Sequence, residues 1–80
     1  MEIVEAEVKK ILKKILKLPD KGFIPYAKSY ARAGLGMTGY ELKIQVLYIL
    51  NNLVFWRGEE ARTAKAYLKG YATSVNAKGK

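Results

Sequence analysis

The chain has 80 residues, which is enough for one small domain and too few for two. It contains neither cysteine nor histidine, so disulfides, thiolate metal sites and the commonest general base in enzymes are excluded. Fifteen lysines and arginines stand against seven acidic residues, and the resulting net charge of +8 is the strongest signal in the composition.

The ends and the apolar segments of the chain bear on its compartment. Glu2, Glu5 and Glu7 are acidic where a secretory signal or an organelle transit peptide would be basic. The longest apolar stretch, residues 44–56, is shorter than the roughly 18 residues that a membrane-spanning helix needs, and three side-chain amides interrupt it. We therefore expect an intracellular, cytoplasmic protein that does not cross a membrane.

Residues 2–18 are predicted to form an amphipathic helix. Its apolar residues recur at spacings of four and three, which places them on one side: Val4, Val8, Ile11, Ile15 and Leu18. Five lysines occupy the other side: Lys9, Lys10, Lys13, Lys14 and Lys17. Pro19 disfavours helical backbone in the residue before it, so we expect the helix to end there.

A second, short helix is predicted from Pro25 to Gly34, because proline suits the first turn of a helix. A third is predicted from about Gly39 to Trp56. It is apolar on nearly every side, which is typical of a helix at the centre of a fold.

Capping signals mark the starts of the last two helices. Thr38 and Glu41 have the spacing of a capping box, in which each side chain accepts a hydrogen bond from a backbone N–H of the first turn. Glu59 and Glu60 open a fourth helix, where negative charge favours the positive end of the helix dipole. Gly70 is a candidate end for this helix.

No segment alternates apolar and polar residues over the length of a strand. The sequence thus predicts an all-α fold: a compact bundle of four helices, the second short, around an apolar third helix. We expect one domain spanning residues 1–74, followed by a disordered tail at residues 75–80.

The positive charge is concentrated in residues 8–34, where eight basic residues face a single acid, Asp20. Closely spaced cations displace counterions from a nucleic-acid backbone. We therefore predict a phosphate-binding surface for DNA or RNA made of six residues: Lys10, Lys13, Lys14, Lys17, Lys28 and Arg32. Four tyrosines beside basic residues could stack on unpaired bases or lie at the edge of the core: Tyr26, Tyr30, Tyr67 and Tyr71.

Two other partners fit the first helix. The lysines could serve solubility alone, while the apolar seam of Val8, Ile11, Ile15 and Leu18 pairs with a second copy of the chain or with a partner helix. A lysine side opposite an apolar side also suits an anionic membrane surface. We disfavour the membrane surface, because a domain this small needs the same apolar residues for its core.

The glycines between residues 34 and 39 match the pattern G-x-G-x-x-G. A dinucleotide site needs a strand before these glycines, and a KH domain needs a sheet beside its G-x-x-G loop, so the segment is interpreted as a loop between helices. A helix-turn-helix is disfavoured because its reading helix would consist mainly of core residues. No pair of carboxylates converges, and we expect no enzyme activity, no catalytic residues, no metal and no cofactor.

Overall fold

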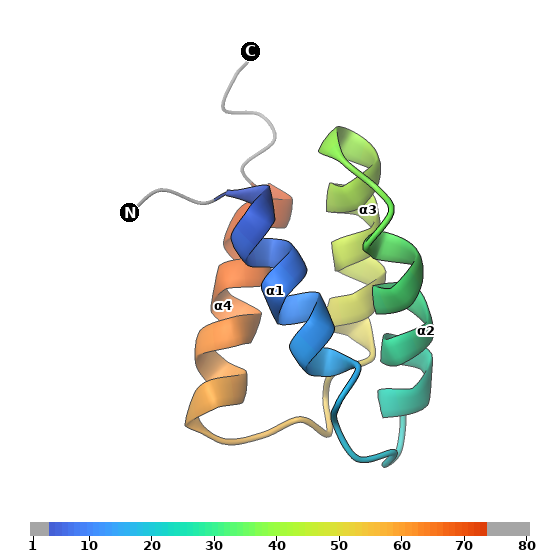
Figure 1. Cartoon of the computed structure of the whole chain (residues 1–80). Coiled ribbons are helices and arrows are strands. Elements are labelled where there is room, and N and C mark those ends of the chain that lie inside the picture. The colour runs from blue at the N-terminus through green and yellow to red at the C-terminus, as the bar shows by residue number, and fades with distance from the viewer. Residues whose placement is uncertain (1–3, 74–80) are drawn as a thin grey trace.

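Four helices make up most of the described chain. The computed structural model describes residues 4–73 and contains α1 (Glu5–Ile15), α2 (Ile24–Gly34), α3 (Gly39–Asn51) and α4 (Glu59–Thr73) (Figure 1). No strand occurs among these residues, so the predicted all-α class with four helices is confirmed. The second helix is no shorter than the first, since each has 11 residues. The predicted tail at residues 75–80 lies outside the described residues.

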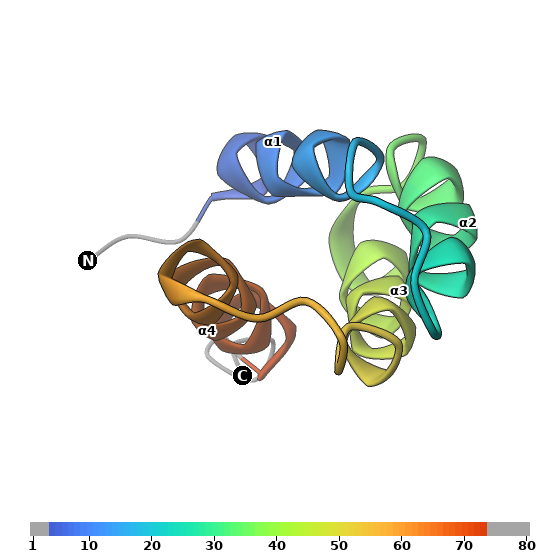
Figure 2. The same cartoon turned by 90° about the horizontal axis from the view of Figure 1, so that it is seen from below.

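The helices form a ring in chain order. α2 packs on α1 and α3, and α4 packs on α3 and α1. The end-on view shows α1 and α3 on opposite sides of the bundle (Figure 2). The composition of the third helix predicted a place at the centre of the fold. In the structure this helix instead occupies one corner of the ring and has an outward side.

The core is built from the predicted apolar stripes. The second helix contributes the small, fully buried Ala27 and Ala31. The largest fully buried side chains come from the other three segments that were expected to be helical: Val8, Leu12, Ile15, Leu42, Val46, Ile49, Leu53 and Leu68. No buried polar side chain lacks a hydrogen-bond partner among the described residues. Burial of the apolar sides is the main source of stability in a fold of this kind.

The outward side of α3 is also apolar. Tyr40, Leu47 and Tyr48 are 66%, 42% and 50% exposed, whereas Leu42 and Val46 on the same helix are fully buried. The apolar residues around this helix thus form two groups: those on one side fill the core, and those on the other side face solvent.

The third helix ends at Asn51, five residues before the predicted end. The Asn52 side-chain amide donates a hydrogen bond of 2.9 Å to the Tyr48 carbonyl, which would otherwise accept from the next turn of helix. Leu53 and Trp56 remain in the core, with exposed fractions of 0% and 8%, but they reach it from turns.

The fourth helix continues past Gly70 to Thr73. Tyr71 and Ala72 are buried, and the Thr73 hydroxyl donates to the Lys69 carbonyl at 2.8 Å. Burial of these two side chains offsets the cost of a glycine inside a helix. At the other end of the fold, α1 ends at Ile15, and turn hydrogen bonds carry the chain on to Leu18.

The start of α3 is held by a carboxylate from α1. The Gly39 N–H donates to Glu5 Oε2 at 2.6 Å, and the Tyr71 hydroxyl of α4 donates to the same oxygen at 3.1 Å. Thr38 makes no side-chain capping hydrogen bond, so the predicted capping box with Glu41 is wrong. Glu5 instead accepts from the first amide of the helix, that of Gly39, and hydrogen bonds to an ionised group are the stronger ones.

The ionisation of both partners reflects this contact. The hydrogen bond from Gly39, with smaller contributions from the Tyr71 hydroxyl and from Lys9 and Lys43, holds the pKa of Glu5 below its ordinary value despite some desolvation. Burial, together with the negative charge of Glu5, raises the pKa of Tyr71 to about 12. One carboxylate therefore ties α1, α3 and α4 together.

Candidate nucleic-acid interface

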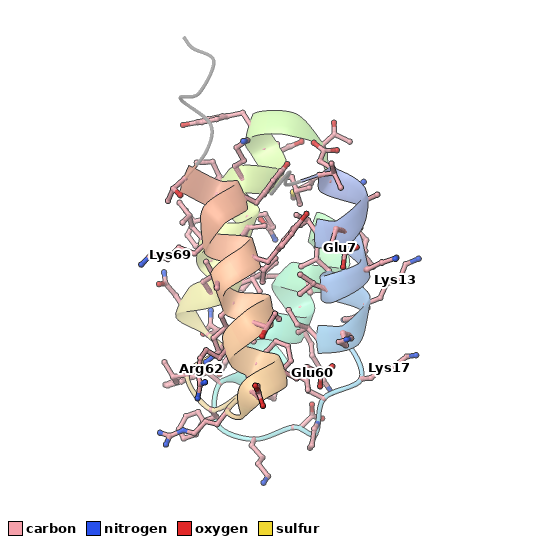
Figure 3. The ribbon with its side chains drawn as sticks, turned by 90° about the vertical axis from the view of Figure 1, so that its left-hand side faces the viewer. Glu7, Lys13, Lys17, Glu60, Arg62 and Lys69 are labelled. Atoms are coloured by element: carbon pink, nitrogen blue, oxygen red, sulfur yellow. The ribbon has the colours of Figure 1, made fainter. Side chains whose placement is uncertain are left out.

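The predicted lysine side of α1 is exposed. Val8, Leu12 and Ile15 are fully buried, which turns the opposite side of the helix to solvent. We call the three lysines at the centre of that side the lysine face: Lys10, Lys13 and Lys17. Figure 3 shows Lys13 and Lys17 pointing away from the bundle on the side opposite α4.

Lys13 and Lys17 make no ion pair within residues 4–73, so their charges are not neutralised there by a neighbouring carboxylate. Lys10 lies 3.7 Å from the Glu7 carboxylate one turn earlier, with its side chain 76% exposed. Exposed pairs of this kind are weak and are screened by salt, so a stronger anion can replace Glu7.

Lys14 belongs to a different surface. Its ammonium group lies 2.7 Å from Glu60 of α4, and this hydrogen bond and charge raise the pKa of Lys14. Figure 3 shows Glu7 and Glu60 between α1 and α4. Lys14 was predicted to belong to the phosphate-binding surface, and the structure instead places it in a bridge between these two helices.

The two residues predicted on α2 differ from each other. The Lys28 ammonium group lies 2.6 Å from Asp20, and its side chain is only 18% exposed. Arg32 is exposed and makes no ion pair with the described residues. Lys28 and Arg32 lie one turn apart on α2, which packs against α1. Arg32 is therefore the freer cation for extending the lysine face.

The dimensions of the lysine face suit a phosphate backbone. At about 1.5 Å of rise per residue, Lys10 and Lys13 are about 4.5 Å apart along the axis of α1, and Lys17 follows in the turn after the helix. Phosphates on one strand of duplex DNA follow one another at about 3.4 Å along its axis. Successive lysines of the lysine face can therefore meet neighbouring phosphates of one strand.

The tyrosines divide between the two predicted roles. Tyr71 is buried, and the half-buried Tyr67 accepts a hydrogen bond of 3.0 Å from the Val4 N–H, so both belong to the edge of the core. Tyr26 and Tyr30 are 61% and 38% exposed. Of the four tyrosines predicted beside basic residues, only the two on α2 are open to a partner.

Exposed rings from α2, α3 and the turns beside them form two contacting groups, Phe23 with Tyr26 and Phe55, and Tyr30 with Tyr48. Tyr26 and Tyr30 lie one turn apart on α2, and we call the two groups together the aromatic surface. Tyr30 stacks on Tyr48 at 5.6 Å between ring centroids, and Phe23 contacts both Tyr26 and Phe55. The ring of Phe55 lies directly on the backbone of Gly22, where a Cβ would collide with it. This surface was not predicted from the sequence, because Tyr48 and Phe55 were expected to lie in a central helix.

The apolar seam that was predicted to pair with another chain lies inside this one. Val8 and Ile15 are fully buried, Ile11 is 8% exposed, and Leu18 is half-buried against the core. The folded chain has no free apolar side on α1 to offer to a second copy or to a lipid interface.

The glycine pattern at residues 34–39 has a structural role. Gly34 is buried at the end of α2, where a Cβ would lie 3.1 Å from Leu12. Gly39 has a positive φ of 61°, which glycine adopts without strain, and its amide is bonded to Glu5. A helix precedes this loop, so the interpretation of the glycines as a connection between helices is confirmed.

A second group of cations lies on the other side of the molecule. Arg57, Arg62 and Lys65 line a pocket together with Trp56. Figure 3 shows Arg62 and Lys69 of α4 pointing away from the side that carries Lys13 and Lys17. The spacing of Arg62, Lys65 and Lys69 predicted that they share one side of the fourth helix. The sequence did not predict that Arg57 joins them at the pocket, because the third helix was expected to continue to Trp56.

Among the residues that the structure describes, no three acidic side chains lie close enough to hold a metal ion. No helix in the same range is long and apolar enough to cross a membrane. Comparison with known proteins gives no relative: no family model, no curated protein and no solved structure matches the chain.

Proposed function

We propose that this protein is a cytoplasmic nucleic-acid-binding domain that contacts phosphates through the lysine face, with Arg32 as its extension. The observation that carries the proposal is the pair Lys13 and Lys17, two exposed cations one turn apart with no carboxylate partner among the described residues. Phosphate contacts of this kind fix the position of a protein on nucleic acid without reading its sequence, so we expect little sequence specificity.

Release of condensed counterions provides the free energy of binding. Each phosphate neutralised by a lysine frees ions from the nucleic acid, and the affinity falls as the salt concentration rises. Lys10 exchanges its weak contact with Glu7 for a phosphate, whereas Lys14 and Lys28 stay in their closer pairs of 2.7 Å and 2.6 Å. The working surface therefore consists of Lys10, Lys13, Lys17 and Arg32.

The aromatic surface provides a reason to test single strands as well as duplexes. Tyr26 and Tyr30 lie on α2, the same helix as Arg32, and unpaired bases stack on exposed aromatic rings. Stronger binding to a single strand would support a contribution from these rings. Equal binding to both forms would support contacts with phosphates alone.

A paired charge reversal tests the proposal. We expect Lys13→Glu with Lys17→Glu to weaken binding to a labelled random-sequence duplex by about tenfold or more at low salt, because two of the engaged cations become repulsive. The matched control is Lys69→Glu, compared with Lys13→Glu alone, because it makes the same change of net charge on the other side of the bundle and lies outside the pocket lined by Arg57, Arg62 and Lys65. Fluorescence anisotropy gives the affinities, and circular dichroism verifies that all of these variants remain helical.

The two single variants must differ for the proposal to stand. A loss that is much larger in Lys13→Glu than in Lys69→Glu supports the lysine face. Equal losses would mean that only net charge matters, and unchanged binding in the Lys13 and Lys17 variant would eliminate this surface.

The aromatic surface supports a second candidate function, a protein interaction module in which the lysines only keep the chain soluble. Exposed apolar residues that gather in this way are characteristic of interaction sites. Sedimentation at increasing concentration would then reveal a dimer that Tyr48→Ser disrupts. A monomer at all concentrations would remove self-association through this surface.

A further inference from the structure

The connection between α3 and α4 forms an open pocket of about 490 Å³. Its apolar wall consists of Val54, Trp56 and Ala61. Three cations from the turn and from the first two turns of α4 complete it: Arg57, Arg62 and Lys65. The connection between α3 and α4 runs on the side of the bundle away from α1 (Figure 2), and the pocket is lined by residues of this connection and of α4.

No carboxylate lines this pocket. The two acids nearest in sequence, Glu59 and Glu60, line a separate pocket between α1 and α4. Arg57, Arg62 and Lys65 make no ion pair with any residue in the described range 4–73. The charged residues at the start of α4 therefore lie on two sides: the acids face α1, and the cations surround the pocket.

The environment of Lys65 shows that this arrangement costs free energy. The side chain is half-buried, and desolvation, with a smaller contribution from the charge of Arg57, lowers the pKa of Lys65. A bound anion would offset both the desolvation and the repulsion between the two cations.

We propose that the pocket formed by Arg57, Arg62, Lys65 and Trp56 binds a phosphate group, either as the free ion or on a small organic phosphate. Guanidinium groups donate paired hydrogen bonds to phosphate oxygens, and a lysine adds a point charge. The apolar wall suits the carbon skeleton of a phosphate ester. This site is independent of the lysine face, because it uses other residues on another side of the molecule.

The chain contains a single tryptophan, Trp56, and it lines the pocket, so its fluorescence provides a probe at this site. The probes are inorganic phosphate and glycerol phosphate, each titrated against sodium chloride of the same ionic strength. Calorimetry under the same conditions detects binding even if the fluorescence does not change. We expect a saturable signal for phosphate that chloride does not produce.

The variants Arg62→Gln and Lys65→Gln each remove one cation from the pocket, and we expect each to weaken phosphate binding by about tenfold. Lys69→Gln is the matched control, because it removes the same charge from an exposed position of α4 outside the pocket and should leave phosphate affinity unchanged. Circular dichroism verifies the fold of all three.

The outcomes separate the two sources of phosphate and the two proposals. Tighter binding of glycerol phosphate than of the free ion supports an ester ligand, and the reverse supports the ion. Absence of a saturable signal in both methods, or an equal loss in Lys69→Gln, overturns the site. Neither result depends on whether the lysine face binds nucleic acid, which is measured with the Lys13 and Lys17 variant.

Discussion

Glu5 shows how one side chain can set the geometry of a small bundle. Its carboxylate accepts hydrogen bonds from Gly39 at the start of α3 and from Tyr71 on α4. The spacing of Thr38 and Glu41 predicted a local capping box, which the structure does not contain. The actual acceptor, Glu5, lies 34 residues away from Gly39 in sequence. It could not be predicted from the sequence, because its position depends on how α1 packs in the fold.

This arrangement predicts a pH dependence of stability. Since folding lowers the pKa of Glu5, the carboxylate contributes stability that is fully present above its ordinary pKa of 4.5 and is lost as the pH falls through the lower value of the folded state. We expect Glu5→Gln to destabilise the protein at neutral pH by about 1 kcal/mol, as the loss of a helix cap does. The difference from the unmodified protein should shrink below pH 4.5.

Urea unfolding at a series of pH values measures this effect. Glu41→Gln is the control, because Glu41 lies in the first turn of the same helix and forms no hydrogen bond with the described residues. A capping box would produce the opposite order, with the larger loss in Glu41→Gln. That order would contradict the cross-helix contact.

At the scale of the elements, the helix predicted most accurately from the sequence was α1, whose apolar residues recur with a clear helical period. The apolar and basic sides of α1 lie as its spacing of four and three indicated. The third helix was harder, because apolar residues on every side carry no information about which side faces the core. Its end was missed because the hydrogen bond from Asn52 to the Tyr48 carbonyl competes with the helix, and hydrophobic periodicity does not register such a bond.

Two leucines on α3 test whether this helix has an outward side. Leu42 is fully buried and Leu47 is 42% exposed, so the same substitution at each differs only in the side of the helix it affects. We expect Leu42→Ala to lower the free energy of unfolding by about 2–5 kcal/mol. Leu47→Ala should lower it by about 0.5 kcal/mol or less, as exposed substitutions do.

Urea or thermal unfolding of both variants gives the comparison. Comparable large losses would show that α3 is enclosed on both sides, as its composition suggested. In that case the aromatic surface around Tyr48 would not be available to a partner.

At the scale of the whole molecule, the charge is divided into two basic sides. The lysine face on α1 and the cations of α4 point in opposite directions, and Glu7 and Glu60 lie between these two helices (Figure 3). The sequence indicated which lysines share the outer side of α1. It did not indicate that Lys14 and Lys28 pair with acids from other segments, since such pairs form only after the helices pack.

The salt dependence of duplex binding tests the central claim most directly. Binding of the purified protein to a labelled random-sequence duplex is followed by anisotropy from about 50 to about 200 mM salt. With Lys10, Lys13, Lys17 and Arg32 each meeting one phosphate, the account predicts a slope of log K against log salt of about −3 to −4. The variant with Lys13→Glu and Lys17→Glu should lose about two units of that slope. Absence of binding at the lowest salt, or an affinity that salt does not change, would contradict a phosphate-binding role for the lysine face.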